Sequence, residues 1–251
     1  MQLKGKKVVL TGAQGGIGRC LSALLKNADA DVIAIGRQAE IDVVQVDLAD
    51  NQCVETLCTD LANQDVDILI NLAGLMHFGD VTELSGKALD NMMSVNLTTP
   101  IKLTQAVIPR MLVHQRGQIV NVGSIFGSLP FPYFSAYSSS KAGLKGFSDA
   151  LRREYYSRGI KVTHISPRGV DTPFNTPAID LFNKQARSNI DSSEKVAEII
   201  MNAIVNEKKT VNIGFSENMF VHINSLLPSF IDKALVSKQT IASQILAGDP
   251  L

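Results

Sequence analysis

The amino end of the chain places a glycine-rich turn between an apolar run and a helical stretch. Residues 8–10 (VVL) are typical of a buried strand, residues 11–18 (TGAQGGIG) form the turn, and residues 19–26 have the spacing of a helix. This order directs backbone N–H groups and the positive end of a helix at one spot, and the glycines leave no Cβ atoms to obstruct a pyrophosphate there. The turn therefore predicts a dinucleotide site, and the alternative is a tight connection that binds nothing.

Further apolar runs follow at intervals, with helical stretches between them. They predict strands at residues 32–35, 43–48, 66–70, 118–123, 161–165 and 210–213. Such alternation is typical of a parallel sheet with helices on both faces. Over residues 1–251 we therefore expect an α/β fold, a single-domain Rossmann-like doubly wound parallel sheet of about seven strands.

One helical stretch contains prolines. Residues 91–115 carry apolar side chains at helical spacing, and Pro100 and Pro109 should kink or divide this helix because proline removes a helical hydrogen bond. Asn96 is the polar exception on the apolar stripe, and a buried amide must find hydrogen-bonding partners.

The composition argues against several classes of protein. The chain is 45% hydrophobic with a formal net charge of zero, so it can bury a large core and has no overall basic signature for nucleic acid. Three cysteines without a C-x-x-C pair and four scattered histidines suggest neither a disulfide framework nor a metal site. The first apolar run is too short for a signal sequence, and no uninterrupted apolar stretch is long enough to span a membrane. We therefore expect a cytoplasmic protein.

Tyr137 and Lys141 are four residues apart and should lie on one face of a helix. An isolated tyrosine has a pKa near 10, and a close cation favours the phenolate and lowers that pKa. Ser124 follows the predicted strand at residues 118–123 and would bring a hydroxyl beside the phenol. The three side chains predict proton transfer to or from a substrate oxygen, although a Tyr-x-x-x-Lys pair also occurs by chance.

The end of the second predicted strand bears on the choice of cofactor. A carboxylate that binds the ribose of NAD is expected there, but the chain has Arg37, which suits the 2′-phosphate of NADP. NADP(H) is therefore preferred over NAD(H), unless Arg37 is an ordinary surface residue. Asp47, near the end of the third predicted strand, either lies beside the adenine or caps the helix that begins around Asn51.

Three later segments concern the substrate. Phe131 and Phe134 belong to an apolar loop that could line a pocket. Residues 167–192 are rich in proline and small polar residues, which suggests a mobile flap over the site. Residues 217–251 form an apolar C-terminal extension with a break expected at Pro228. Its densest part, residues 219–235, favours a packed or oligomer-burying tail over an acyl-chain lid or a peripheral membrane contact.

Taken in order, these motifs resemble those of the short-chain dehydrogenase/reductase family over roughly residues 6–173. The resemblance implies a nicotinamide cofactor and a homodimer or homotetramer. It assigns catalytic roles to Asn96, Ser124, Tyr137 and Lys141, with Lys141 lowering the tyrosine pKa and Asn96 supporting a proton relay. It assigns cofactor contacts to Gly12, Gln14, Gly16, Ile17, Gly18, Arg37, Asp47, Leu48, Asn71, Ala73, Gly74, Tyr137, Lys141, Pro167, Val170 and Thr172, and substrate contacts to Ser124, Phe131, Phe134 and Tyr137.

The chain departs from the family pattern at three points. Gly15 stands where NADP-preferring members often have a basic residue. The glycine loop also fits the Gly-x-x-Gly15-x-x-Gly18 spacing of longer sugar-nucleotide members. The usual Pro-Gly after the sixth strand is replaced by Pro167-Arg168-Gly169.

The expected activity is that of an NADP(H)-preferring oxidoreductase, a carbonyl reductase or alcohol dehydrogenase acting on a small apolar ketone or secondary alcohol. The cofactor would supply the hydride chemistry. Two alternatives stay open: a non-catalytic dinucleotide-sensing protein, and an epimerase or dehydratase that retains its cofactor.

Overall fold

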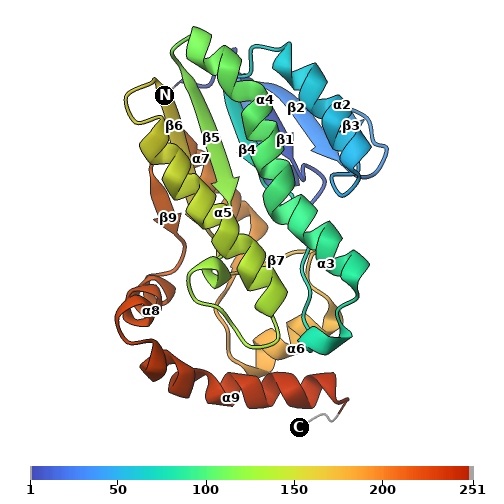
Figure 1. The fold of residues 1–251 in the computed structure, drawn as a ribbon, viewed down its shortest axis with the longest axis vertical. Coiled ribbons are helices and arrows are strands. Elements are labelled where there is room, and N and C mark those ends of the chain that lie inside the picture. The colour runs from blue at the N-terminus through green and yellow to red at the C-terminus, as the bar shows by residue number, and fades with distance from the viewer. Residues whose placement is uncertain (1, 249–251) are drawn as a thin grey trace.

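The computed structural model describes residues 2–248 and contains a seven-stranded parallel sheet. The strands follow the order β3-β2-β1-β4-β5-β6-β9, from right to left in Figure 1. They are β1 (Lys7–Thr11), β2 (Asp31–Gly36), β3 (Val43–Gln45), β4 (Ile68–Asn71), β5 (Gly117–Val122), β6 (Ile160–Ser166) and β9 (Thr210–Asn212). The predicted doubly wound parallel sheet is confirmed.

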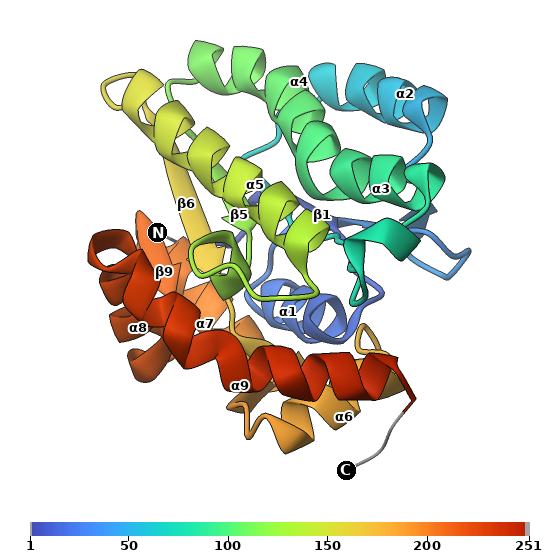
Figure 2. The same cartoon turned by 60° about the horizontal axis from the view of Figure 1, so that its bottom comes forward.

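Helices cover both faces of this sheet, as Figure 2 shows. One face carries α1 (Gly16–Asn27) and α7 (Ser193–Val205), and the other carries α2 (Asn51–Ala62), α4 (Thr99–Val113) and α5 (Ser135–Glu154). Successive strand residues face opposite sides. Val8 and Leu10 of β1 therefore join the core beneath α1 and α7, whereas Val9 joins the core beneath the other helices.

The strand order reverses at β1: β2 and β3 lie on one side of β1, and β4 and the later strands lie on the other. Connections leave these strands in opposite directions, and a crevice opens at their carboxyl ends. The predicted motif residues follow the strands and therefore gather at this edge.

The helical stretch predicted at residues 91–115 is divided, but not at Pro109. It comprises α3 (Gly86–Met93), a π-helical turn (Ser94–Thr98) and α4. Pro100 is the second residue of α4, directly after the π-helical turn, and α4 continues through Pro109. The interruption comes from the π-helical turn, which carries Asn96.

The third strand ends at Gln45, three residues earlier than predicted. The helix that follows is capped by Asp50, whose side chain accepts a hydrogen bond from the Cys53 N–H group at 2.9 Å. Asp47 therefore does not cap α2. Its carboxylate accepts a hydrogen bond from the Ala49 N–H group at 2.9 Å.

Residues 167–192 contain regular structure. They form β7 (Gly169–Asp171), α6 (Pro177–Gln185) and β8 (Ile190–Ser192), and β7 and β8 pair in parallel as a separate two-stranded sheet. Within this segment only the connections between these elements are irregular.

The C-terminal extension forms α8 (Phe215–Leu226) and α9 (Pro228–Leu246), with the predicted break at Pro228. In Figures 1 and 2, α9 runs alongside α6 at one end of the molecule. Residues 249–251 of the predicted extension lie outside the described residues. The described helices include none with the length and apolar character needed to cross a bilayer.

Candidate active site

The carboxyl ends of the central strands border a cleft of about 650 Å³. Most predicted site residues line it: Gly12, Gln14, Gly16, Ile17, Gly18, Arg37, Asp47, Leu48, Ala73, Gly74, Ser124, Phe134, Tyr137, Lys141, Pro167, Val170 and Thr172. Three predicted residues, Asn71, Asn96 and Phe131, have other surroundings, described below.

The glycine loop packs backbone against backbone where a side chain would not fit. Gly12 has a φ of +71°, and a Cβ atom there would lie 2.8 Å from the Ala73 Cα atom. A Cβ atom on Gly18 would lie 2.1 Å from the Gly12 carbonyl oxygen. The Thr11 Oγ1 atom accepts hydrogen bonds from the Leu72 and Ala73 N–H groups at 3.1 and 3.2 Å. These contacts fix the loop against the chain that follows β4.

The N-terminus of α1 begins at this loop without a side-chain cap. Its N-cap residue is Gly15, and the first turn carries no acidic residue. In contrast, side chains cap α2, α6 and α7. Uncapped N–H groups and the helix dipole favour an anion. The loop therefore fits the pyrophosphate of a dinucleotide.

Arg37 lies just beyond the end of β2, at the edge of the cleft. Its exposed side chain has no hydrogen-bonding or ion-pair partner within residues 2–248. Glu40, by contrast, is paired: Arg19 donates to its two oxygens at 2.8 and 2.9 Å, and Gln14 donates at 3.0 Å. The hydrogen bonds from Arg19 and Gln14 lower the pKa of Glu40 to about 2. This edge thus presents an available cation beside a neutralised carboxylate.

Tyr137 and Lys141 lie one turn apart on α5 and are only 7% and 4% exposed. The Lys141 Nζ atom lies 5.9 Å from the Tyr137 ring centroid and donates a hydrogen bond to the Val122 carbonyl oxygen at 3.1 Å. Ser124 follows β5, and its Oγ atom accepts a hydrogen bond from the Phe126 N–H group at 3.2 Å and lies close enough to the Tyr137 phenol to act on its pKa. The structure therefore brings the three predicted groups together at one wall of the cleft.

The electrostatics of this group differ from the sequence-based expectation. The motif predicts that Lys141 lowers the pKa of Tyr137, but burial raises that pKa to about 12, although the hydrogen bond with Ser124 acts in the opposite direction. Burial also lowers the pKa of Lys141 to about 8. Each charged form loses its contact with water, and the ammonium is directed at the Val122 carbonyl oxygen.

Asn96 is fully buried, and its amide joins two segments behind the cleft. Its Oδ1 atom accepts a hydrogen bond from the Leu75 N–H group at 2.7 Å, and its Nδ2 atom donates to the Leu75 carbonyl oxygen at 2.8 Å. Nδ2 also donates to the Ser140 Oγ atom at 2.9 Å. The side chain thus holds the chain after β4 against α5 and positions other residues of the site.

Asn71 belongs to a buried chain of polar side chains across the sheet. Its Nδ2 atom donates to the Asn121 Oδ1 atom at 2.8 Å, and Asn121 Nδ2 donates to the Ser148 Oγ atom at 2.9 Å. The Ser148 Oγ atom hydrogen-bonds with the His164 Nδ1 atom at 3.1 Å, and burial lowers the pKa of His164 to about 4. The Asn71 side chain therefore supports the sheet beneath the cleft, in contrast to the predicted ribose contact.

Aromatic side chains lie beside Tyr137, whose ring centroid is 6.3 Å from that of Phe126. Phe126 and Phe134 line the cleft, with ring centroids 5.0 Å apart. Phe78 stacks on Phe134 at 4.8 Å, and Phe131 stacks on Phe126 at 4.7 Å. Phe131 thus forms a second layer behind Phe126, which differs from its predicted contact with substrate.

Sequence reasoning missed several residues that line this end of the cleft. Met76 comes from the segment after β4, Asn91 from α3, and Ile179 and Asn183 lie one turn apart on α6. The four-residue spacing of Ile179 and Asn183 was a usable signal, but only the fold shows which face of α6 meets the cleft.

Metal-binding side chains do not gather in this cleft. No group of three or more His, Cys, Asp or Glu residues capable of holding a metal ion occurs in the part of the chain that the structure describes.

Comparison with known proteins identifies the family. The mouse protein "Dehydrogenase/reductase SDR family member 7B" is 30% identical over 268 residues, which cover 94% of this chain and 82% of the mouse protein. A 4-hydroxyisoleucine dehydrogenase complexed with NADH is 25% identical with a TM-score of 0.73, over 83% of this chain and 97% of that chain. A short chain dehydrogenase from Burkholderia cenocepacia in complex with NADP shares the fold, with a TM-score of 0.79 at 22% identity over 94% of this chain and 100% of that chain. The model of the short chain dehydrogenase family matches residues 6–180, and this chain therefore belongs to the short-chain dehydrogenase/reductase family.

Proposed function

We propose that this protein is an NADP(H)-preferring oxidoreductase that interconverts an apolar ketone and its secondary alcohol. The observation that carries the proposal is the grouping of Tyr137, Ser124 and Lys141 at one wall of a cleft whose opposite end is an uncapped helix N-terminus. A nicotinamide dinucleotide bound there would supply or accept the hydride.

The side chains of this group have separable roles. The Ser124 hydroxyl holds the substrate oxygen, and Tyr137 transfers the proton to or from that oxygen. Burial keeps the phenol protonated at neutral pH, which is the state needed to donate a proton during ketone reduction. General acid catalysis of this kind contributes roughly 10²–10⁴-fold to the rate.

Two features support NADP(H), with NAD(H) as the alternative. Arg37 is available at the edge of the cleft, and a guanidinium suits a 2′-phosphate. Glu40, a carboxylate near the end of β2, is paired with Arg19 and so is less able to bind the ribose hydroxyls of NAD. The family includes both kinds of complex, as the bound NADP and NADH of the two compared structures illustrate.

The character of the cleft beside Tyr137 supports an apolar substrate. Phe126, Phe134 and Ile179 line the cleft together with Tyr137, and Asn91 and Asn183 add neutral amides to its lining. A charged substrate would lose its contact with water against these apolar side chains. We therefore expect uncharged aliphatic or aromatic ketones to react faster than sugars or carboxylates.

We assign residues 1–251 to one nucleotide-binding domain in a cytoplasmic homodimer or homotetramer. Residues 167–192 then act as the substrate flap, and residues 217–251 as the apolar extension. Leu226, Leu227 and Phe230 are exposed where α8 meets α9, which supports burial of this corner in an oligomer, with a peripheral membrane contact or an acyl-chain lid as alternatives. Light scattering, vesicle sedimentation and turnover of substrates with increasing chain length distinguish the three.

The test is a substrate panel measured with NADPH and with NADH. Ketones, acyl thioesters, sugars and steroids are scored by the loss of reduced-nicotinamide absorbance, with Tyr137→Phe as the matched variant. The proposal expects net NADPH consumption with apolar ketones, and turnover lowered at least about a hundredfold by the variant. Cofactor binding without consumption would favour the sensing protein, and product formation without net consumption would favour the epimerase or dehydratase.

A further inference from the structure

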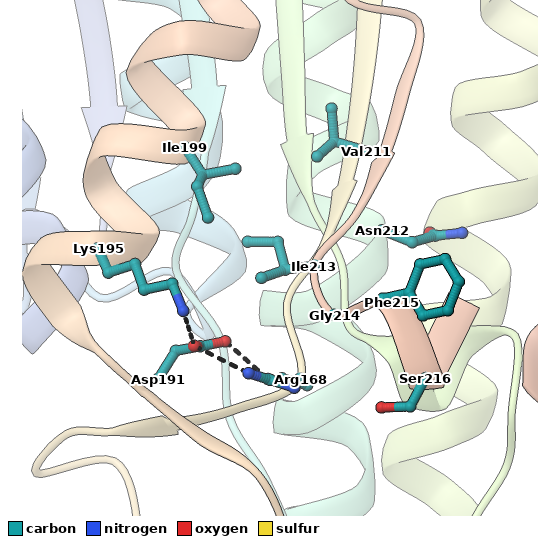
Figure 3. Close-up of a pocket in the computed structure, with 10 residues that line it drawn as sticks. All are labelled: Arg168, Asp191, Lys195, Ile199, Val211, Asn212, Ile213, Gly214, Phe215 and Ser216. Carbon is teal, nitrogen blue, oxygen red and sulfur yellow. Dashed lines mark hydrogen bonds and ion pairs between the residues drawn. The ribbon is translucent and has the colours of Figure 1, made fainter. Parts of the chain in front are cut away.

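Arg168 lies at the boundary between the active-site cleft and a second cavity of about 530 Å³. It stands between Pro167 and Gly169, immediately before β7, where the family pattern has glycine. Figure 3 shows the second cavity, with Arg168 and Lys195 converging on Asp191. The loop that borders the proposed nicotinamide end of the cleft therefore carries a long cationic side chain.

The Arg168 guanidinium makes a two-point contact with a buried carboxylate. Its Nε atom donates to the Asp191 Oδ2 atom at 2.7 Å, and its Nη2 atom donates to Asp191 Oδ1 at 3.1 Å. The Asp191 side chain is 2% exposed, and Lys195 Nζ donates to its Oδ1 atom at 2.7 Å. Such planar, charge-assisted pairs are strong and fix geometry, because both hydrogen bonds require one orientation.

This ion pair reinforces a weak sheet. Asp191 is the middle residue of β8, and β7 and β8 pair over only three residues each. Two short strands are marginal on their own in water. The Arg168–Asp191 ion pair thus adds a side-chain contact that stabilises the short backbone pairing of β7 with β8.

The strand held in this way is a wall of the cleft. Val170 lies on β7 and Thr172 follows it, and both line the cleft. Thr172 packs against the glycine loop, because a Cβ atom on Gly16 would lie 2.9 Å from the Thr172 Cγ2 atom. A displacement of β7 would therefore change the cleft where the nicotinamide is expected.

The C-terminal extension reaches the same guanidinium. Arg168 Nη1 donates to the Glu217 Oε2 atom in the first turn of α8 at 3.2 Å. Gly214 makes room for this contact: its φ is +105°, and a Cβ atom there would lie 2.2 Å from Glu217 Oε2 and 3.2 Å from Arg168 Cδ. The backbone before α8 is thus shaped to admit the Arg168–Glu217 pair.

We propose that Arg168 is a positioning residue for cofactor binding: its pair with Asp191 fixes β7 as the wall of the nicotinamide end of the cleft, and Glu217 anchors this pair to α8. The proposal rests on the nicotinamide cofactor of the proposed function but not on turnover of any substrate.

The test compares two ligands that differ only at the end in question. NADPH spans the whole cleft, whereas 2′-phospho-ADP-ribose lacks the nicotinamide. Arg168→Ala should raise the dissociation constant of NADPH, measured by nicotinamide fluorescence, by about tenfold, equivalent to the loss of one charged hydrogen bond. The dissociation constant of 2′-phospho-ADP-ribose, measured by calorimetry, should change less than about twofold.

Further variants separate positioning from general loss of stability. Arg168→Lys keeps the charge but not the two-point geometry and should recover part of the NADPH affinity, and Glu217→Gln should have a smaller effect than Arg168→Ala. Lys6→Ala is the matched control, because Lys6 Nζ pairs with Asp67 Oδ1 at 2.8 Å at the amino ends of β1 and β4, with side chains 23% and 15% exposed. It should lower the melting temperature and leave both dissociation constants unchanged.

Two results would overturn the proposal. One is wild-type NADPH affinity in a folded Arg168→Ala variant. The other is an equal weakening of NADPH and 2′-phospho-ADP-ribose in both Arg168 variants, which would indicate a general effect on the fold. Failure of the wild type to reduce any compound in the panel would count against the proposed function alone, since these measurements require only binding.

Discussion

Replacement of His164 by asparagine should alter the pH dependence of folding stability. His164 lies on β6, is 2% exposed, and its ring contacts the Ser148 hydroxyl. Burial lowers its pKa from 6.5 to about 4; the charges of Lys145 and Lys141 act in the same direction, and that of Asp149 opposes them. Below pH 6.5 the unfolded chain binds a proton that the folded chain does not, so this residue makes the fold less stable as the pH falls.

The magnitude follows from these two pKa values. Between pH 7.5 and pH 5, nearly every unfolded chain becomes protonated at His164 while few folded chains do, which costs about 2 kcal/mol of unfolding free energy. The loss continues to roughly 3 kcal/mol near pH 4, where the folded form also begins to bind the proton. His164→Asn removes the titrating ring and keeps an amide that can hydrogen-bond with Ser148, so this part of the pH dependence should disappear.

Urea unfolding followed by circular dichroism at pH 7.5 and pH 5 measures the effect. The matched control is His222→Asn, because His222 is exposed on α8. Wild type and control should each lose about 2 kcal/mol more than His164→Asn between the two pH values. An equal loss in all three proteins would show that the buried chain from Asn71 to His164 does not exclude the proton.

Three further predictions concern the cleft. Arg37→Ala should raise the dissociation constant of NADPH about 10- to 100-fold, as expected for the loss of one charge-assisted hydrogen bond, and leave that of NADH nearly unchanged. The control is Arg153→Ala, which removes an exposed arginine elsewhere on the surface. Equal weakening of both cofactors by Arg37→Ala would contradict the assignment of Arg37 to the 2′-phosphate. Gly18→Ala forces a Cβ atom to within 2.1 Å of a loop carbonyl oxygen and should weaken both cofactors at least about tenfold, whereas Gly146→Ala, with open space around its Cβ position, should bind them normally. The rate of ketone reduction should fall as the pH rises through about 8, because the Lys141 ammonium is charged only below its pKa, and a rate that stays level to pH 10 would argue against a role for that charge.

The sequence predicted this fold well because local patterns and long-range packing agree. The apolar residues of β2 and β4 enter the cores on both faces of the sheet, Ala34, Ile68 and Ile70 on one side and Ile35 and Leu69 on the other, so these runs predict strands without knowledge of their neighbours. The glycine loop could also be predicted from the sequence, because only glycine tolerates the close contacts at positions 12 and 18. At such positions the backbone itself dictates the residue.

The interpretation failed where a side chain had two compatible environments. Asn71 follows the correct strand, yet its amide hydrogen-bonds with Asn121 inside the sheet, and nothing in its neighbours along the chain indicates that choice. Phe126 and Phe131 are both aromatic residues of one apolar segment, and only the folded structure shows that Phe126 lines the cleft while Phe131 stacks against it. The partners of Arg168 lie 23 and 49 residues away, so its ion pair could not be read from local spacing.

The pKa of Tyr137 depends on two opposing effects of similar size. Burial that raises a phenol from its ordinary pKa to about 12 makes the phenolate about 3 kcal/mol less accessible. The Lys141 Nζ atom lies 5.9 Å from the Tyr137 ring centroid, and a full positive charge at about that distance from the phenolate, at an effective dielectric constant of about 20, would favour it by roughly 3 kcal/mol. In this structure the hydrogen bond to Val122 directs the Lys141 ammonium elsewhere, and burial prevails. The Tyr137 phenol therefore stays protonated at neutral pH, at a buried position beside Ser124 where little water is present.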